Sequence, residues 1–214
     1  WEIWNEQNAD NFWGPKANAA DYVEVLKQGY AAIKAIDPNV TVLAGGMSPV
    51  DGSSSTIDPM TFTKTLYAGG AKNSFDAIAH HPYTYNLSPA SAKPWNYWFQ
   101  MYKIYDIMNQ NGDAGKKIWI TEYGAPTGGA GTGHELSSIL PFMYGRDYMT
   151  QNAQSIIMTD FINEISKIKV WTGPVFWYSL IDINSSSADP EGSFGIIKSD
   201  KTKKQSYTVL QNSN

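Results

Sequence analysis

Residues 117–124 read Lys-Ile-Trp-Ile-Thr-Glu-Tyr-Gly, and residues 1–8 read Trp-Glu-Ile-Trp-Asn-Glu-Gln-Asn. Each stretch is a short run rich in Ile and Trp that leads to a glutamate, Glu122 in the first and Glu6 in the second. Short apolar runs of this kind are typical of strands buried in a parallel sheet. The two stretches therefore predict two strands, each with a carboxylate at its carboxyl end.

The rest of the chain alternates helical and strand patterns around these two runs. From Asp21 to Ile36 the apolar residues recur at helical spacing, and the pattern stops at Asp37-Pro38. By the same reasoning the sequence predicts helices over residues 21–36, 59–68, 95–109 and 147–168, strands over 1–5, 40–44, 75–80, 117–121 and 173–180, and a long loop over 124–143. Five buried strands alternating with helices indicate an α/β fold with a parallel sheet covered on both faces. No composition change marks a linker, so residues 1–214 are interpreted as one domain.

Composition and charge exclude several classes of protein. The 214 residues carry a net charge of −4, and Arg146 is the only arginine, which argues against nucleic acid or an anionic membrane as partner. The chain has no cysteine, no apolar run near the roughly 18 residues of a membrane span, and no recognisable signal peptide. Its cellular location is left open. Eight Trp and thirteen Tyr are a surplus that suits a cleft for the flat faces of sugar rings.

Reactive side chains gather where the predicted strands end. In parallel α/β sheets the functional sites lie at the carboxyl ends of the strands. There the sequence places Asn5-Glu6, His81-Pro82-Tyr83, Glu122 and Trp177. Two carboxylates surrounded by aromatic residues are the equipment of glycoside hydrolysis, in which one protonates the leaving oxygen while the other attacks the sugar or activates water.

The motifs resemble those of a known clan. Trp-Glu-Ile-Trp-Asn-Glu and Trp-Ile-Thr-Glu-Tyr-Gly are similar to the fourth- and seventh-strand signatures of the retaining glycosidases on (β/α)8 barrels, the clan that holds the cellulase family and the β-xylosidase-like family 39. The His-Pro-Tyr and Phe-Trp-Tyr-Ser segments resemble the sixth and eighth strands, and the segment from Phe194 to Tyr207 resembles the closing segment. The resemblance runs from residue 1 to about residue 210. It implies a partial TIM-type barrel of about five parallel strands, corresponding to strands 4–8 of the clan.

The resemblance also implies roles for individual residues. Glu6 would be the acid/base and Glu122 the nucleophile of a double displacement. The other four positions would contact the sugar or line its site: Asn5 at the substrate 2-hydroxyl, Tyr83 against the nucleophile, His81 along the wall, and Trp177 as a platform beneath the ring. No cofactor and no metal is implied, and the substrate would be a β-linked oligosaccharide or glycoside.

Three departures from the clan pattern shape the expectations. Gln7 stands where the clan usually has proline, which should loosen the backbone beside Glu6. The clan places an arginine from its second strand near the nucleophile, whereas this chain has no counterpart of that strand and no arginine other than Arg146. The first three βα units of the clan have no counterpart in this chain, which begins without Met in mid-strand. Two open sheet edges would invite aggregation, so we expect either a further N-terminal barrel segment or a homo-oligomer. A non-catalytic or weakly active carbohydrate-binding remnant of such a barrel is the alternative function.

Overall fold

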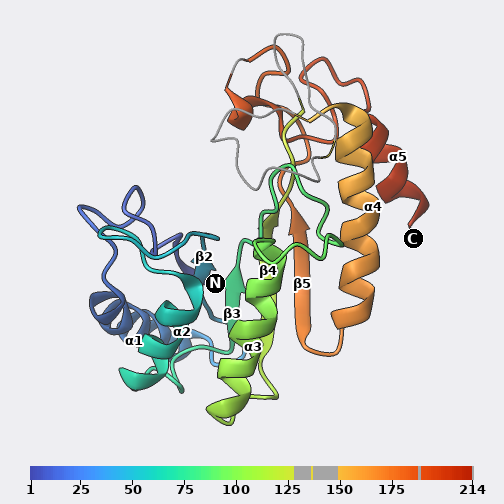
Figure 1. Ribbon diagram of the computed structural model, residues 1–214. Helices are drawn as coiled ribbons and strands as arrows, with labels where there is room; N and C mark the ends of the chain where they lie inside the picture. Colours follow the sequence, from blue (N-terminus) through green and yellow to red (C-terminus); the bar gives the residue numbers. More distant parts are fainter. Residues whose placement is uncertain (128–135, 137–148, 188, 214) are drawn as a thin grey trace. The chain divides into compact units, whose positions relative to one another are not determined.

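A computed structural model describes residues 1–127, 136, 149–187 and 189–213. Its described part holds one parallel sheet whose strands follow the order of the chain, β1-β2-β3-β4-β5 (Figure 1). The strands are β1 (Glu2–Asn5), β2 (Leu43–Met47), β3 (Ala77–His80), β4 (Lys117–Tyr123) and β5 (Thr172–Trp177). The predicted α/β class and the five parallel strands of a partial barrel are confirmed.

Helices fill the connections between the strands. They are α1 (Ala19–Ile36), α2 (Pro59–Ala68), α3 (Gln100–Gln110), α4 (Gln151–Ile168) and α5 (Gln205–Asn212), with short 3-10 helices at Tyr97–Phe99 and Pro190–Ser193. Local chemistry sets where they begin. The side chain of Asn18 accepts the N–H groups of Ala20 and Asp21 at the start of α1, and Asp58 followed by proline begins α2.

Most of the predicted elements lie where the sequence places them. The helix over 59–68 has the predicted bounds, whereas the predicted 95–109 helix is a 3-10 turn followed by α3. Strand β2 continues through Gly45 and Gly46, where the sequence predicted its end, and α4 begins at Gln151 after the cap of Thr150. Helix α5 was not predicted. Within the predicted 124–143 loop, residues 128–135 and 137–143 lie outside the described residues.

The chain divides into two compact units, although residues 1–214 were interpreted as one domain. The first unit comprises residues 1–82, 99–122 and 171–175 and holds nearly the whole sheet. Along it, α1 contacts α2 and α2 contacts α3 (Figure 1). Ile78, Ile118 and Ile120 are fully buried, and Ile3 meets α1 at Gly29.

The opposite face of this sheet is apolar along the strands and carries polar side chains where the strands end. Leu43, Ala77 and Ala79 are buried there, and Trp119 packs against them. Ala79 lies opposite Trp119 in the parallel pairing of β3 and β4. Because side chains alternate along a strand, His81 and Thr121, two residues further on, belong to this face. The candidate site is therefore at the carboxyl ends of β3 and β4.

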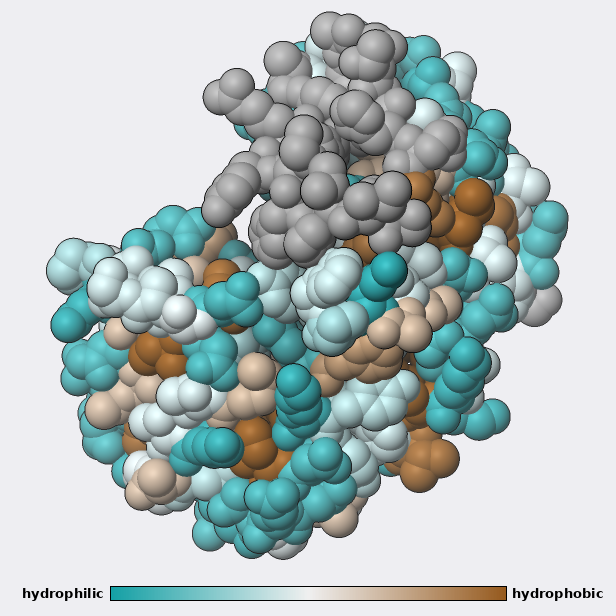
Figure 2. Space-filling model, in the orientation of Figure 1, coloured by the Kyte–Doolittle hydropathy of each residue, from teal (hydrophilic) through white to brown (hydrophobic). Residues whose placement is uncertain are grey.

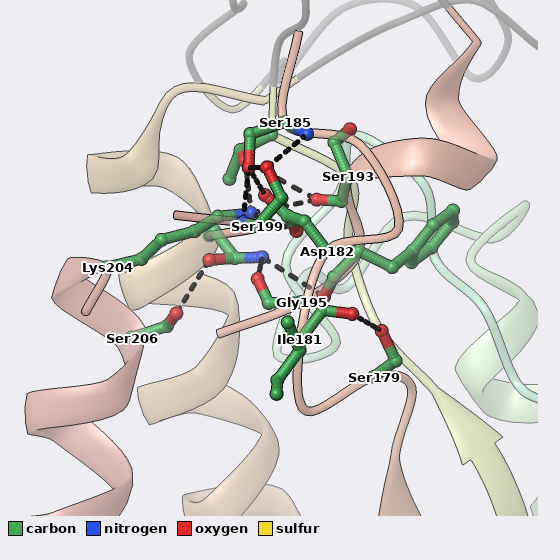
Figure 3. A network of polar contacts seen from close by, with 12 residues as sticks. Ser179, Ile181, Asp182, Ser185, Ser193, Gly195, Ser199, Lys204 and Ser206 are labelled. Atoms are coloured by element: carbon green, nitrogen blue, oxygen red, sulfur yellow. Dashed lines mark hydrogen bonds and ion pairs between the residues drawn. The ribbon is translucent and has the colours of Figure 1, made fainter. Parts of the chain in front are cut away.

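The second unit comprises residues 83–98, 123–170 and 176–214 and has its own aromatic core. Tyr123 stacks on Phe161 of α4 with ring centroids 4.5 Å apart, and Trp98 meets both rings edge-on. A buried polar network lies elsewhere in this unit (Figure 3). In it, Nζ of Lys204 donates to Asp182 at 2.7 Å, to Thr127 Oγ1 at 2.6 Å and to the Ser193 carbonyl at 2.9 Å. All three ammonium hydrogens thus have acceptors, which is what a buried charge requires.

On the face shown in Figure 2, hydrophobic residues form separate patches among hydrophilic ones. In the part of the chain that the structure describes, no helix is both long and apolar enough to cross a membrane.

Candidate active site

His81 brings the two predicted catalytic carboxylates together. It follows β3, its backbone N–H donates to the Met47 carbonyl, and its side chain is 1% exposed. Its Nδ1 lies 3.1 Å from Oε1 of Glu6 and 3.8 Å from Oε2 of Glu122. Those two oxygens are therefore at most about 7 Å apart, the sum of the two distances. The sequence predicted all three residues for one site, and the structure places all three within the first unit.

The backbone that carries Glu6 is constrained. Its N–H donates to the Gly46 carbonyl at 2.8 Å, which extends the pairing of β1 with β2 beyond Asn5. Glu6 has φ of 47° and Trp4 has φ of 72°, in the left-handed region that residues with side chains seldom occupy. Such strain tends to persist at functional positions, where the surrounding contacts hold it in place.

The buried side-chain amides of Gln7 and Asn8 make hydrogen bonds that hold this part of the backbone in place. Gln7 is 1% exposed, and its amide donates to the Gly45 carbonyl at 2.9 Å. Asn8, fully buried, accepts the Ser48 N–H at 2.8 Å and donates to the carbonyls of Ser48 and Ile57. The expected loosening at Gln7 is therefore wrong. The side chain of Gln7 anchors the turn after Glu6 by a hydrogen bond that proline could not make.

Glycines in β2 leave room for the site. A Cβ at Gly46 would lie 2.1 Å from Nε2 of His81 and 2.7 Å from Oε1 of Glu2. A Cβ at Gly45 would lie 2.4 Å from the Ile3 carbonyl oxygen. Neither position has space for a side chain. The strand can therefore continue past residues 45 and 46 because both are glycine.

Glu2 and Thr121 extend the site behind the imidazole. Oε1 of Glu2 accepts the Gly46 N–H at 2.5 Å and the Thr121 hydroxyl at 3.0 Å. Oγ1 of Thr121 lies 3.0 Å from Nε2 of His81. The structure thus connects both Glu6 and, through Thr121, Glu2 to the ring of His81.

Glu122 departs from simple alternation. Strand periodicity predicts Thr121 and Glu122 on opposite faces, yet Thr121 meets Nε2 of His81 and Glu122 approaches Nδ1 of the same ring. The end of β4 therefore presents two successive side chains to one imidazole. The side chain of Glu122 is 32% exposed and that of Glu6 is 15% exposed, so Glu122 is the more open of the two carboxylates to an incoming ligand.

His80, the neighbour of His81, serves a different purpose. It is completely buried, and burial together with the nearby charge of His81 lowers the pKa of His80 to about 3. A histidine with so low a pKa is neutral at physiological pH and packs as part of the core. Its position on the opposite face from His81 follows from strand alternation.

The three other predicted site residues are placed less directly. Asn5 is the last residue of β1, is exposed, and immediately precedes Glu6. Tyr83 and Trp177 belong to the second unit. There Tyr83 packs on Tyr123 and Phe194, and Trp177 meets Tyr123 and Phe161 edge-on. Sugar contacts at Asn5, Tyr83 and Trp177 stay predictions.

Sequence reasoning missed Thr121, Gly46 and the partners of Glu2. The glycine pair within an apolar run was a usable signal, because glycine inside a strand marks a close approach of other groups. Thr121 carried no comparable signal. No group of three His, Asp or Glu residues in the described ranges is arranged to hold a metal ion.

A parallel βα sheet brings two carboxylates to one histidine near its carboxyl edge, and its fold matches part of the barrels of solved glycoside hydrolases. No protein-family model matches the chain, and no curated protein sequence does. Solved structures do match, and those described next have identities that establish the fold alone.

Three of these solved structures are representative. A monomeric β-xylosidase from Caulobacter crescentus CB15 matches at a TM-score of 0.66 and 18% identity, over 98% of this chain and 40% of its own. A family 39 glycoside hydrolase from the gut symbiont Bacteroides cellulosilyticus WH2 matches at 0.66 and 22%, over 100% of this chain and 40% of its own. An α-L-arabinofuranosidase from Thermotoga maritima matches at 0.62 and 14%, over 94% and 36%. The chain thus spans about 40% of the length of the first two and less of the third.

Proposed function

We propose that the site belongs to a retaining glycoside hydrolase that cleaves β-glycosidic bonds of a glucoside, a xyloside or a short glucan. The observation that carries the proposal is His81 Nδ1 lying within 4 Å of both Glu6 and Glu122. Retention needs the two carboxyl groups roughly 5–5.5 Å apart, whereas inversion needs about 6.5–9.5 Å. The two contacts limit the distance between Oε1 of Glu6 and Oε2 of Glu122 to about 7 Å, which is compatible with the separation that retention needs.

The environment supports the assignment of roles. Glu122, the more exposed carboxylate, is suited to attack the anomeric carbon, and Glu6, the more enclosed one, to hold a proton for the leaving oxygen. While Glu122 is ionised, its charge favours a proton on its neighbour. Once Glu122 carries the sugar its charge is gone, so Glu6 can release the proton and activate water.

The test is azide rescue of two alanine variants on an aryl β-glycoside. In Glu6→Ala, an aryl leaving group departs without proton donation, so the sugar still reaches Glu122 and its release becomes slow. Azide needs no general base and should restore turnover, with a β-glycosyl azide as product because two inversions keep the configuration. In Glu122→Ala, azide entering the vacated space should give the α-azide. Anomeric proton signals in NMR spectra distinguish the two.

Glu24→Ala is the matched control, since Glu24 is an exposed glutamate on α1 that pairs only with Lys27 in the described contacts. It should keep wild-type turnover. Proton donation and water activation are each worth about 10²- to 10⁴-fold, so Glu6→Ala should lose activity in that range. The α-azide from Glu6→Ala and the β-azide from Glu122→Ala would reverse the roles. Sugar binding without turnover by the unmodified chain would favour the carbohydrate-binding alternative.

A further inference from the structure

We propose that Glu2 is a positioning residue that acts through Thr121 to fix the tautomer of His81, so that Nδ1 of His81 faces Glu6 and shares a proton with it. The inference rests on the proposed function, in which Glu6 is the acid/base. Glu2 lies four residues before Glu6, and in the described part of the chain its carboxylate bonds to Gly46 and Thr121. Its effect on the reaction would pass through the imidazole.

The direction of each hydrogen bond follows from what each atom can donate. A carboxylate oxygen only accepts, so the hydrogen between Thr121 and Glu2 belongs to the threonine hydroxyl, 3.0 Å from Oε1. A hydroxyl has one hydrogen. With that hydrogen directed at Glu2, Oγ1 of Thr121 is an acceptor toward Nε2 of His81 at 3.0 Å. The proton in this contact is therefore on Nε2.

The same reasoning gives the role of Nδ1, on the other side of the His81 ring. A neutral imidazole that carries its proton on Nε2 presents a lone pair at Nδ1, and Nδ1 lies 3.1 Å from Oε1 of Glu6. One proton then lies between Glu6 and His81, on the carboxyl group or on the ring. The charged groups around the imidazole are Glu6 and Glu122 at Nδ1 and Glu2 beyond Thr121 at Nε2, with neutral His80 adjacent in sequence.

The fold keeps Glu2 in this place. Besides Thr121, Oε1 of Glu2 accepts the Gly46 backbone N–H at 2.5 Å, a donor fixed within β2. Glycine at 46 leaves space for both Glu2 and His81. Since Glu2 lies on an exposed strand, these two hydrogen bonds, and not burial, hold its carboxylate.

The first test reads the tautomer without reference to activity. Imidazole ¹⁵N shifts separate protonated from bare ring nitrogens in protein labelled with ¹⁵N-histidine. The chain has three histidines, so His80→Gln and His134→Gln variants assign the His81 signals. We expect the spectra to show a proton on Nε2 of His81 and none fixed on Nδ1, the nitrogen that faces Glu6. A bare Nε2 with a protonated Nδ1 in the unmodified chain would overturn the proposal.

Variants then test whether Thr121 and Glu2 set that tautomer. Thr121→Val keeps the shape but removes the hydroxyl, and we expect a mixture of tautomers; Thr121→Ser restores the hydroxyl and should restore the single one. Glu2→Gln removes the charge and should also give a mixture. Wild-type His81 spectra in Thr121→Val and Glu2→Gln would contradict the proposal. Far-UV circular dichroism confirms that each variant is folded.

The kinetic consequence separates this inference from the proposed function. With a poor leaving group, which needs the proton of Glu6, Thr121→Val and Glu2→Gln should lower kcat/KM about tenfold; with an activated aryl leaving group they should leave it nearly unchanged. A uniform loss for both leaving groups would indicate a merely structural role. If azide rescue fails for Glu6→Ala but the spectra behave as expected, the hydrogen-bond relay stands and the proposed function does not.

Discussion

At His81, one imidazole contacts two carboxylates through a single nitrogen. Groups this close interact electrostatically, so the charge on any one of them changes the field that the others experience. Substitution of any one of Glu6, His81 or Glu122 should therefore change the protonation of the other two as well as its own chemistry. Effects of paired substitutions among these three residues should not be additive.

Gly46 offers a test at this scale. Gly46→Ala would place a methyl group 2.1 Å from Nε2 of His81, so the imidazole must move away from Thr121 and from Glu6. We expect a loss of about 1–3 kcal/mol in unfolding free energy, measured by denaturant titration, and a fall in any glycosidase turnover.

Gly115→Ala is the control, because an added Cβ there has nothing within 4 Å. It should leave the unfolding free energy unchanged or slightly higher. Equal stability and equal turnover in the two variants would show that His81 does not depend on the space at Gly46.

At the scale of elements, Asp76, which directly precedes β3, connects that strand to α1 and to the residue before β2. Nζ of Lys34 lies 2.8 Å from Oδ2 of Asp76, the Val42 N–H donates to that carboxylate, and so does the Tyr30 hydroxyl. Burial by itself raises the pKa of Asp76, but the hydrogen bonds from Lys34, Val42 and Tyr30 outweigh it and hold the pKa below its ordinary value. Lys34 and Tyr30 belong to α1, and Val42 directly precedes β2.

The sign of the pH dependence follows. A carboxyl whose pKa is lower in the folded state stabilises the fold above its unfolded pKa of about 3.9, and that contribution is lost as pH falls through the lower folded value. Asp76→Asn should therefore cost about 1–2 kcal/mol at pH 7 and progressively less toward pH 3, in urea titrations at several pH values. A pH-independent cost would mean that packing, not charge, accounts for the effect.

The sequence predicted the elements better than their ends. Repeated helical spacing and short apolar runs sufficed for the five strands and four of the helices, because burial of one face depends on pattern alone. Gly45 and Gly46 were interpreted as the end of a strand, since glycine usually interrupts one, whereas here close packing against His81 and Ile3 requires them. The placement of Glu6 and Glu122 at strand ends could be predicted from the sequence. The partners of Glu2 depend on β1, β2 and β4 together and could not be predicted.

For the whole molecule, the open sheet has consequences for assembly. In the described sheet β1 and β5 each have one neighbouring strand, and large apolar side chains near them are exposed: Trp1 by 74%, Trp4 by 52% and Phe176 by 51%. Edges of this kind pair readily with other strands. We expect the purified chain to form a homo-oligomer, with a mass above 23.7 kDa in light scattering.

Two variants with lysine at the edges, Trp4→Lys and Phe176→Lys, check that prediction, because edge lysines oppose strand pairing. They should lower the measured mass. A monodisperse monomer at micromolar concentration for the unmodified chain would contradict the oligomer, and the separate patches seen on one face (Figure 2) would then be ordinary surface.

Because Lys204 is buried, the rate at which a reagent modifies it would report how often the second unit opens. Burial lowers the pKa of Lys204 although Asp182 opposes the change, and the closed network keeps its side chain out of reach of reagents in water. An acylating reagent in water should modify the neighbouring exposed Lys203 rapidly. It should modify Lys204 only after the network of Figure 3 opens. The delay between the two, read peptide by peptide in a mass spectrometer, would time the spontaneous opening of this part of the fold.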